Sequence, residues 1–288
     1  MLSGRILLVA FEGWNDATEG ASGALKAIAE QFEMKTLEAV DPEDYYDFQF
    51  SRPMVEFDEE GNRVLSWPGT ELLHPDASEI AANPNLENLF LLMGTEPSRR
   101  WLSFAGEVLE MVEDREIDHV IMLGAMLADV PHTRPMQVFK SSQNQSLREK
   151  FDLEPSRYEG PVGILTVLAQ AFESEGIPVL SLWGSVPHYV HNTTNPKAAM
   201  SFIQEINLLT GFDFSLDVLS ELSGEWERSI DEMAQGDDEM AAYVSQLESS
   251  RDALDSEQVS GDALAKEFER YLRQRPETGG EFWKLVRN

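Results

Sequence analysis

The chain has 288 residues, of which 42% are hydrophobic, so it can bury the core of one large domain or of one domain with an extension. It contains no cysteine, which excludes disulfide frameworks, cysteine nucleophiles and thiolate metal sites. The formal net charge is −30, from 52 Asp and Glu against 22 Lys and Arg, and a surface of this sign repels nucleic acids and anionic membranes.

The N-terminal segment does not have the pattern of a secretory signal peptide. The apolar run of residues 5–11 is short and passes directly into a polar turn at residues 12–16. No apolar stretch is long enough to cross a bilayer. Because the absence of cysteine also fits a reducing compartment, we expect a cytoplasmic protein with no nucleic-acid and no membrane partner.

Short apolar runs alternate with amphipathic helical segments from the N-terminus to about residue 210. The expected strands are residues 5–11, 34–40, 88–94, 120–123, 137–141 and 177–183. The expected helices are residues 17–32, 41–48, 99–115, 144–151, 164–175 and 197–209. Alternation of this kind favours parallel βαβ units and an α/β domain.

The first helix carries two signals of its own. Asp16 stands at its start with Glu19 three residues later, which is an acidic version of the capping box. Small side chains form one face of the helix and would allow close approach to the sheet or to another subunit. They are Ala17, Gly20, Ala21, Gly23 and Ala24.

A hairpin interrupts the alternation. Residues 54–57 and 63–67 are apolar runs that flank an acidic loop with a glycine, residues 58–62, which is a hairpin signal. Hairpins do not belong to a plain doubly wound sheet. We therefore expect an excursion from the domain near residues 53–67.

Two of the buried runs end in the same way. Residues 120–123 are followed by Gly124 and residues 179–183 by Gly184, and we expect each strand to stop at its glycine. Both runs then lead to titratable side chains, where open α/β sheets bind ligands. The side chains expected at this shared rim are Asp129, His132, Arg134 and His188.

Beyond Gly211 the sequence has almost no β-branched runs. We expect an α/β domain over residues 1–214 and a helical extension over residues 215–288, with breaks near 235–237, 255–261 and 275–280. Two apolar stripes have helical spacing. They are Leu216, Leu219, Leu222, Trp226 and Ile230, and then Leu264, Phe268, Tyr271 and Leu272.

One interpretation of the rim is enzymatic. Asp16, Asp129, His132, Arg134 and His188 could converge as a hydrolase-like or phosphorylase-like site. However, no G-x-S-x-G motif and no Ser-His-Asp spacing accompanies them. Helix capping, typically worth about 1 kcal/mol, already accounts for Asp16. A loop clasp accounts for His132 with Asp129, so we lean against catalysis.

Two ligand sites are weaker alternatives. His132, His188 and His191 could hold a divalent metal, but histidines in loops more often bond carbonyl groups. Gly160 and Gly163 precede a helix whose free N–H groups could hold an anion, although ordinary turns are commoner there. We expect no cofactor.

Motifs spread over the α/β region resemble those of the proteasome assembly chaperone 2 (PAC2) family, in particular its actinobacterial members of unknown function. The matching pieces are Gly13–Ala17, Gly94–Ser98 with Trp101, Gly124-Ala125, Ala128–Pro135, Tyr158, Gly160-Pro161, Gly163-Ile164, Trp183, Val186–Val190 and Asn195–Ala198. Several pieces in the same order are far more specific than any one of them.

The resemblance implies a three-layer α/β/α fold with a mostly parallel central sheet, like that of nucleoside phosphorylases and related hydrolases. It also implies self-assembly into a dimer or trimer and, as in archaeal and eukaryotic relatives, a proteasome-related partner. No catalytic residue is implied. We therefore expect a non-enzymatic, self-associating and chaperone-like protein, with the small-residue face of the first helix and the C-terminal helices as contact surfaces.

Overall fold

The computed structural model describes residues 1–58, 60–156, 158–191 and 193–255. The strands are β1 Ile6–Glu12, β2 Met34–Ala39, β3 Met54–Phe57, β4 Arg63–Ser66, β5 Thr70–Pro75, β6 Leu89–Thr95, β7 His119–Ala128, β8 Val138–Ser141 and β9 Val179–Pro187. The α-helices are α1 Gly20–Ala29, α2 Pro42–Tyr45, α3 Ala77–Ala82, α4 Trp101–Glu113, α5 Gln145–Phe151, α6 Ile164–Ser174, α7 Pro196–Thr210, α8 Asp217–Gln235 and α9 Asp238–Asp255. Short 3₁₀ helices are η1 Ala17–Glu19, η2 Pro84–Asn88 and η3 His188–Val190.

The main sheet has seven strands in the order β2-β5-β6-β1-β7-β9-β8. Its centre is parallel, because β1 pairs with β6 and β7, and β7 pairs with β9, in the same direction. The pairs β2–β5, β5–β6 and β8–β9 are antiparallel. The mostly parallel sheet predicted from the sequence is confirmed.

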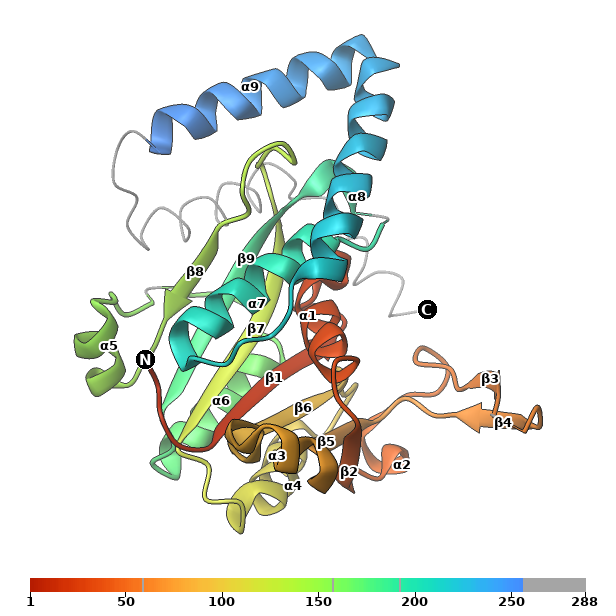
Figure 1. Cartoon of the computed structure of the whole chain (residues 1–288), viewed down its shortest axis with the longest axis vertical. Helices are drawn as coiled ribbons and strands as arrows, with labels where there is room; N and C mark the ends of the chain where they lie inside the picture. The colour runs from red at the N-terminus through yellow and green to blue at the C-terminus, as the bar shows by residue number, and fades with distance from the viewer. Residues whose placement is uncertain (59, 157, 192, 256–288) are drawn as a thin grey trace.

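Helices cover both faces of this sheet. On one face, α1 and α7 pack on strand side chains such as Leu8 and Leu123. On the other face, α4 and α6 pack on the strand side chains that point the opposite way, such as Val9 and Met122. The strands are buried on both faces, which explains why they appear in the sequence as continuous apolar runs. The three-layer α/β/α fold is confirmed (Figure 1).

The strands do not end at the two glycines, and that prediction is wrong. β7 continues through Gly124 to Ala128, and β9 continues through Gly184 to Pro187. The glycines make room for large neighbours instead: a Cβ on Gly124 would lie 2.6 Å from the Trp183 ring. The missing side chain is therefore a packing requirement within the strand, a role that a single sequence does not distinguish from a strand end.

The first two parallel strands, β1 and β2, are not adjacent in the sheet as the predicted βαβ unit would place them. β2 is parallel in direction to β1 but does not neighbour it, because β5 and β6 lie between them. β5 and α3 were not predicted, because their segments, residues 70–75 and 77–82, are short and mix polar with apolar residues. The small-residue face of α1 lies against another element of the same chain. It packs on α7, where a Cβ on Gly20 would lie 2.9 Å from that of Ala198.

β3 and β4 form an antiparallel hairpin that is separate from the main sheet. In Figure 1 it projects from the body of the molecule beyond β2 and α2. We call residues 53–67 the arm. Every residue of β3 is exposed, and so are three of the four in β4.

The chain after α7 forms the long helices α8 and α9, joined near Gln235–Asp237 where a break was predicted. α8 packs beside α7, and α9 extends across the end of the molecule where β7 and β9 finish (Figure 1). The further breaks and the second apolar stripe lie outside the described residues. Within the described part of the chain, no helix has both the length and the apolar character needed to span a bilayer.

Candidate functional site

The parallel strands β7 and β9 deliver both rim histidines to the same place. The strands are in register to their ends, with Ala128 opposite Pro187, and the loops that follow meet at Tyr189. The Tyr189 ring lies edge-on to His132 and to His188, with ring centres 5.8 Å apart in each case. The structure therefore brings together the side chains that the two strand endings placed on one rim.

The partners within the rim differ from those expected. Asp129 lies beside His188, with 3.3 Å between its Oδ1 and the His188 Nδ1, and it also accepts a hydrogen bond from Tyr243 of α9 at 3.1 Å. It therefore does not orient His132. Asp129 and His188 clasp the two loops to each other and to α9.

His132 is 1% exposed and has a partner for each of its polar atoms. Its backbone N–H donates to the Tyr189 hydroxyl oxygen at 2.8 Å, its Nδ1 lies 2.8 Å from the same oxygen, and its Nε2 lies 3.0 Å from Asp231 Oδ1. Burial raises the pKa of Tyr189, so the hydroxyl keeps its proton. Because a carboxylate only accepts, the His132 Nε2–H donates to Asp231, and the Tyr189 hydroxyl bonds both the backbone N–H and Nδ1 of the same residue.

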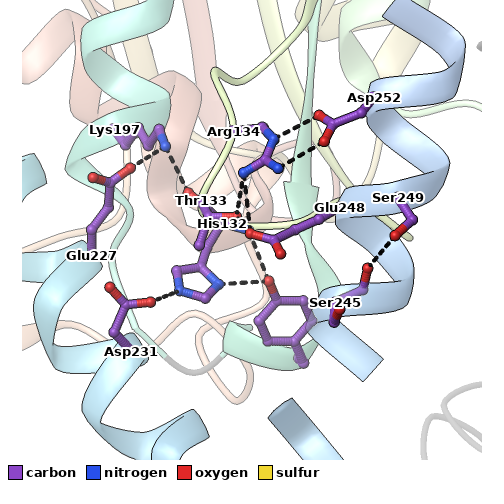
Figure 2. Close-up of polar contacts among 11 residues, drawn as sticks. His132, Thr133, Arg134, Lys197, Glu227, Asp231, Ser245, Glu248, Ser249 and Asp252 are labelled. Carbon is purple, nitrogen blue, oxygen red and sulfur yellow. Dashed lines mark hydrogen bonds and ion pairs between the residues drawn. The ribbon is translucent and has the colours of Figure 1, made fainter. Parts of the chain in front are cut away.

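Acidic side chains of α8 and α9 hold the two cations of the rim (Figure 2). Arg134 forms a bidentate pair with Asp252, at 2.8 Å from Nε and 2.9 Å from Nη2, and a third bond to Glu248 at 3.1 Å. Lys197, at the start of α7, donates to Glu227 and to the His132 carbonyl oxygen. The Arg134 guanidinium lowers the pKa of the Asp252 carboxyl.

A small apolar cluster secures α8 over the rim. Trp226 and Ile230 are 9% and 1% exposed and pack with Val190 of η3. The Trp226 ring also stands edge-on to the His132 imidazole, with centres 6.3 Å apart. The predicted stripe of α8 therefore includes its docking face, although Leu222 remains 44% exposed.

About half of this arrangement was not predicted from the sequence. Lys197 lies in the Asn195–Ala198 motif, which was interpreted as part of the family resemblance and not as part of the rim. The acidic residues of α8 and α9 look like ordinary solvent-exposed side chains in the sequence. No local sequence pattern therefore distinguishes those that reach the rim from those that face solvent. The residues missed were Tyr189, Lys197, Glu227, Asp231, Tyr243, Glu248 and Asp252.

Asp16 is buried at the same edge of the sheet but has a separate role. Its Oδ1 accepts from the N–H groups of Ala21 at 2.7 Å and Ser22 at 3.2 Å, which caps α1. Glu19 has a left-handed backbone conformation and its side chain makes no capping bond, so the predicted capping box is wrong. Burial raises the pKa of Asp16.

The raised pKa of Asp16 predicts a pH-dependent effect of Asp16→Asn. A folded-state pKa above the unfolded one means that the folded state binds the proton more tightly. Wild type should therefore lose stability relative to the variant as pH rises from below 3.8 through the folded pKa, by about 1.4 kcal/mol for each tenfold difference in proton affinity between the two states. Urea unfolding of both proteins between pH 4 and pH 7 measures this. A difference that does not change with pH would contradict it.

The glycine-rich turn before α6 already holds an anion of this chain. The Ile164 N–H at the start of α6 donates to Glu96 Oε1 at 2.9 Å, and Asn15 Nδ2 donates to the same oxygen at 3.0 Å. Gly163 is close to these groups, since a Cβ there would lie 2.0 Å from Asn15 Nδ2. The Gly160–Gly163 turn therefore supports a fixed internal contact at the ends of β1 and β6.

The three candidate metal ligands are not gathered into a binding group. Both ring nitrogens of His132 face partners, and His191 Nδ1 lies 2.8 Å from the His188 carbonyl oxygen. Over the residues that the structure covers, no three side chains of the metal-binding types form a cluster. The geometry gives no support to the metal alternative.

Comparison with known proteins identifies the family. The model of the PAC2 family matches residues 10–234, which is most of the chain. The chain belongs to the PAC2 family. A crystal structure of a PAC2 family protein from Streptomyces avermitilis is 37% identical, with a TM-score of 0.73, over 83% of this chain and 99% of that one. No curated protein matches the chain significantly.

Two mycobacterial structures are also similar to this PAC2 chain. A proteasome-assembly chaperone homologue of Mycobacterium tuberculosis is 35% identical, with a TM-score of 0.72, over 83% of this chain and 99% of that one. A protein of unknown function from the same organism is 27% identical, with a TM-score of 0.79, over 95% of this chain and 91% of that one. The family and its actinobacterial affinity, both expected from the motifs, are confirmed.

Proposed function

We propose that this PAC2 protein is a self-associating, chaperone-like interaction protein, and that its arm is the contact between copies. The observation that carries the proposal is the exposure of large apolar side chains along the hairpin. In the arm, Met54 is 63% exposed, Val55 46%, Phe57 71%, Val64 41%, Leu65 57% and Trp67 48%. A monomeric soluble protein rarely exposes so many together.

The register of the hairpin sorts these side chains by face. Val55 pairs with Leu65, and Phe57 pairs with Arg63, so Val55, Phe57 and Leu65 share one face. The opposite face is more mixed, because Glu56 stands opposite Val64. The arm thus presents one largely apolar face with a single charged residue, Arg63, which resembles the apolar core and polar rim of an interface.

A second copy of the chain is the occupant that fits best. An isolated two-stranded hairpin is at best marginally stable in water, so packing against another surface would stabilise it. Each strand of the arm also has a free edge, since among the described strands β3 and β4 pair only with each other. The acidic residues of the arm lie mainly in its tip, residues 58–62, so two copies would meet along the apolar strands and not through the tip.

The proposed partner beyond the chain itself is related to the proteasome. Its support is the mycobacterial relative described as a proteasome-assembly chaperone homologue. The enzymatic alternative receives less support, because His132, Arg134, His188 and Asp129 already have partners within the chain. Co-purification of a tagged chain from its native lysate tests the partner, and recovery without proteasome components would count against it.

Substitution of the apolar face should dissociate the oligomer. We expect Val55→Ser, Phe57→Ser and Leu65→Ser together to lower the sedimentation coefficient at micromolar concentration to that of a monomer, because burial of such side chains contributes roughly 1.5–3 kcal/mol each. Leu102→Ser is the matched control, since Leu102 is 85% exposed but lies on α4, away from the arm. Equal sedimentation of the triple variant and wild type would contradict the proposal.

A further inference from the structure

The cationic side chains of the rim all pair with carboxylates from one part of the chain. Arg134 and Lys197 belong to the α/β part of the chain, in the loop after β7 and in the first turn of α7. The carboxylates that bind them, Glu227, Glu248 and Asp252, all come from α8 and α9 (Figure 2). The contact is therefore between a basic rim and an acidic helical pair, in a chain that has little positive charge to spare.

A cavity lies beneath this contact. Its volume is about 20 Å³, which is room for about one water molecule. Its walls on the α/β side include His132, Arg134 and Lys197, whereas Trp226 of α8 and Arg251 of α9 close it from the other side. Displacement of α8 and α9 would therefore widen the cavity and free the cations.

One buried polar group points to a ligand. Ser185 of β9 lines the cavity and is 2% exposed, yet its hydroxyl has no hydrogen-bond partner among the described residues. A buried hydroxyl without a partner is costly and unusual. It supplies a further donor beside the guanidinium and ammonium groups, so the donors that converge here match an oxyanion.

We propose that the rim is an oxyanion-binding site for a carboxylate or phosphate group, and that the acidic side chains of α8 and α9 occupy it as an internal substitute for that ligand. Asp252 demonstrates the geometry, because its two oxygens take the fork of Arg134 as a bound carboxylate would. A ligand competes with α8 and α9, so binding and opening of the helical pair are coupled. The site is distant in sequence from the arm and does not depend on the proposed self-association.

Removal of the internal substitute should expose the site. We expect Glu248→Gln with Asp252→Asn to bind inorganic phosphate or succinate about tenfold or more tightly than wild type, because Arg134 loses its charged partners. The two probes separate the phosphate and carboxylate chemistries. The control is Glu225→Gln with Glu239→Gln, which removes the same number of charges at exposed positions of α8 and α9. Isothermal titration at constant ionic strength measures all three proteins.

Two further results decide the proposal. Arg134→Gln added to the Glu248→Gln, Asp252→Asn protein should remove the gain in affinity. In wild type, phosphate should speed hydrogen exchange of α9 amides more than chloride does at equal ionic strength, which tests the site even if the variants fail to fold. Binding that is no tighter than in the control, or exchange that is the same in both salts, would overturn it.

Discussion

Replacement of Gly94 by alanine should be among the most destabilising single-methyl changes in this chain. Gly94 lies in β6, between β1 and β5, and a Cβ there would stand 2.0 Å from the Gly69 carbonyl oxygen and 2.7 Å from the Thr70 Cα. Those atoms are backbone of the neighbouring strand, so no side chain can rotate away. We expect a loss of about 3 kcal/mol, near the upper end for overpacking.

The control for this change is Gly106→Ala in α4. A Cβ on Gly106 meets no atom within 4 Å, and alanine is the better helix former. We expect Gly106→Ala to stabilise the protein by about 1 kcal/mol. Thermal unfolding separates the two, since each kcal/mol shifts the midpoint by about 2–4 °C in a domain of this size. Equal or reversed shifts would show that β5 can yield at this contact.

Replacement of Trp226 by alanine should release α8 and α9 from the rim. Truncation of a buried tryptophan costs about 3–5 kcal/mol. Ile230 is the other buried α8 residue of the same apolar cluster, and the ion pairs, such as Arg134–Asp252 with side chains 31% and 56% exposed, contribute little each. The loss should therefore appear as local opening and not as unfolding of the α/β layers.

Hydrogen exchange resolved along the chain measures this opening. Amides of residues 217–255 should exchange about 100-fold faster in Trp226→Ala, whereas those of β1, β6 and β7 should not change. Leu222→Ala is the control, because Leu222 is on the same helix but 44% exposed, and its effect should stay within about threefold. A uniform increase over all strands would contradict the local role assigned to Trp226.

The sequence predicted the layers because strands that are buried on both faces consist of continuous apolar runs, such as residues 120–123. The helices between them have apolar stripes at helical spacing. It did not predict β5, since that strand is short and its two leucines, Leu72 and Leu73, stand between polar residues. Gly124 and Gly184 were misinterpreted because a glycine that admits a neighbouring ring looks the same in sequence as one that ends a strand.

For the candidate site, the similar sequences that follow two parallel strands were enough to predict that His132 and His188 lie close together. Their partners could not be predicted, because Asp231 and Glu248 lie about one hundred residues away and reach the rim only through the docking of α8 and α9. Docking depends on the packing of Trp226 and Ile230, and a stripe of apolar residues does not indicate which surface it will meet.

The central claim is that the arm joins copies of this chain, and the mass of the 288-residue chain in solution tests it most directly. Light scattering coupled to size-exclusion chromatography, at micromolar concentration, should give at least twice the 32.4 kDa of one chain. Deletion of residues 53–67 with a short Gly-Ser replacement should reduce the mass to that of a monomer. A wild-type mass of one chain across this range, or an oligomer that survives the deletion, would contradict the claim.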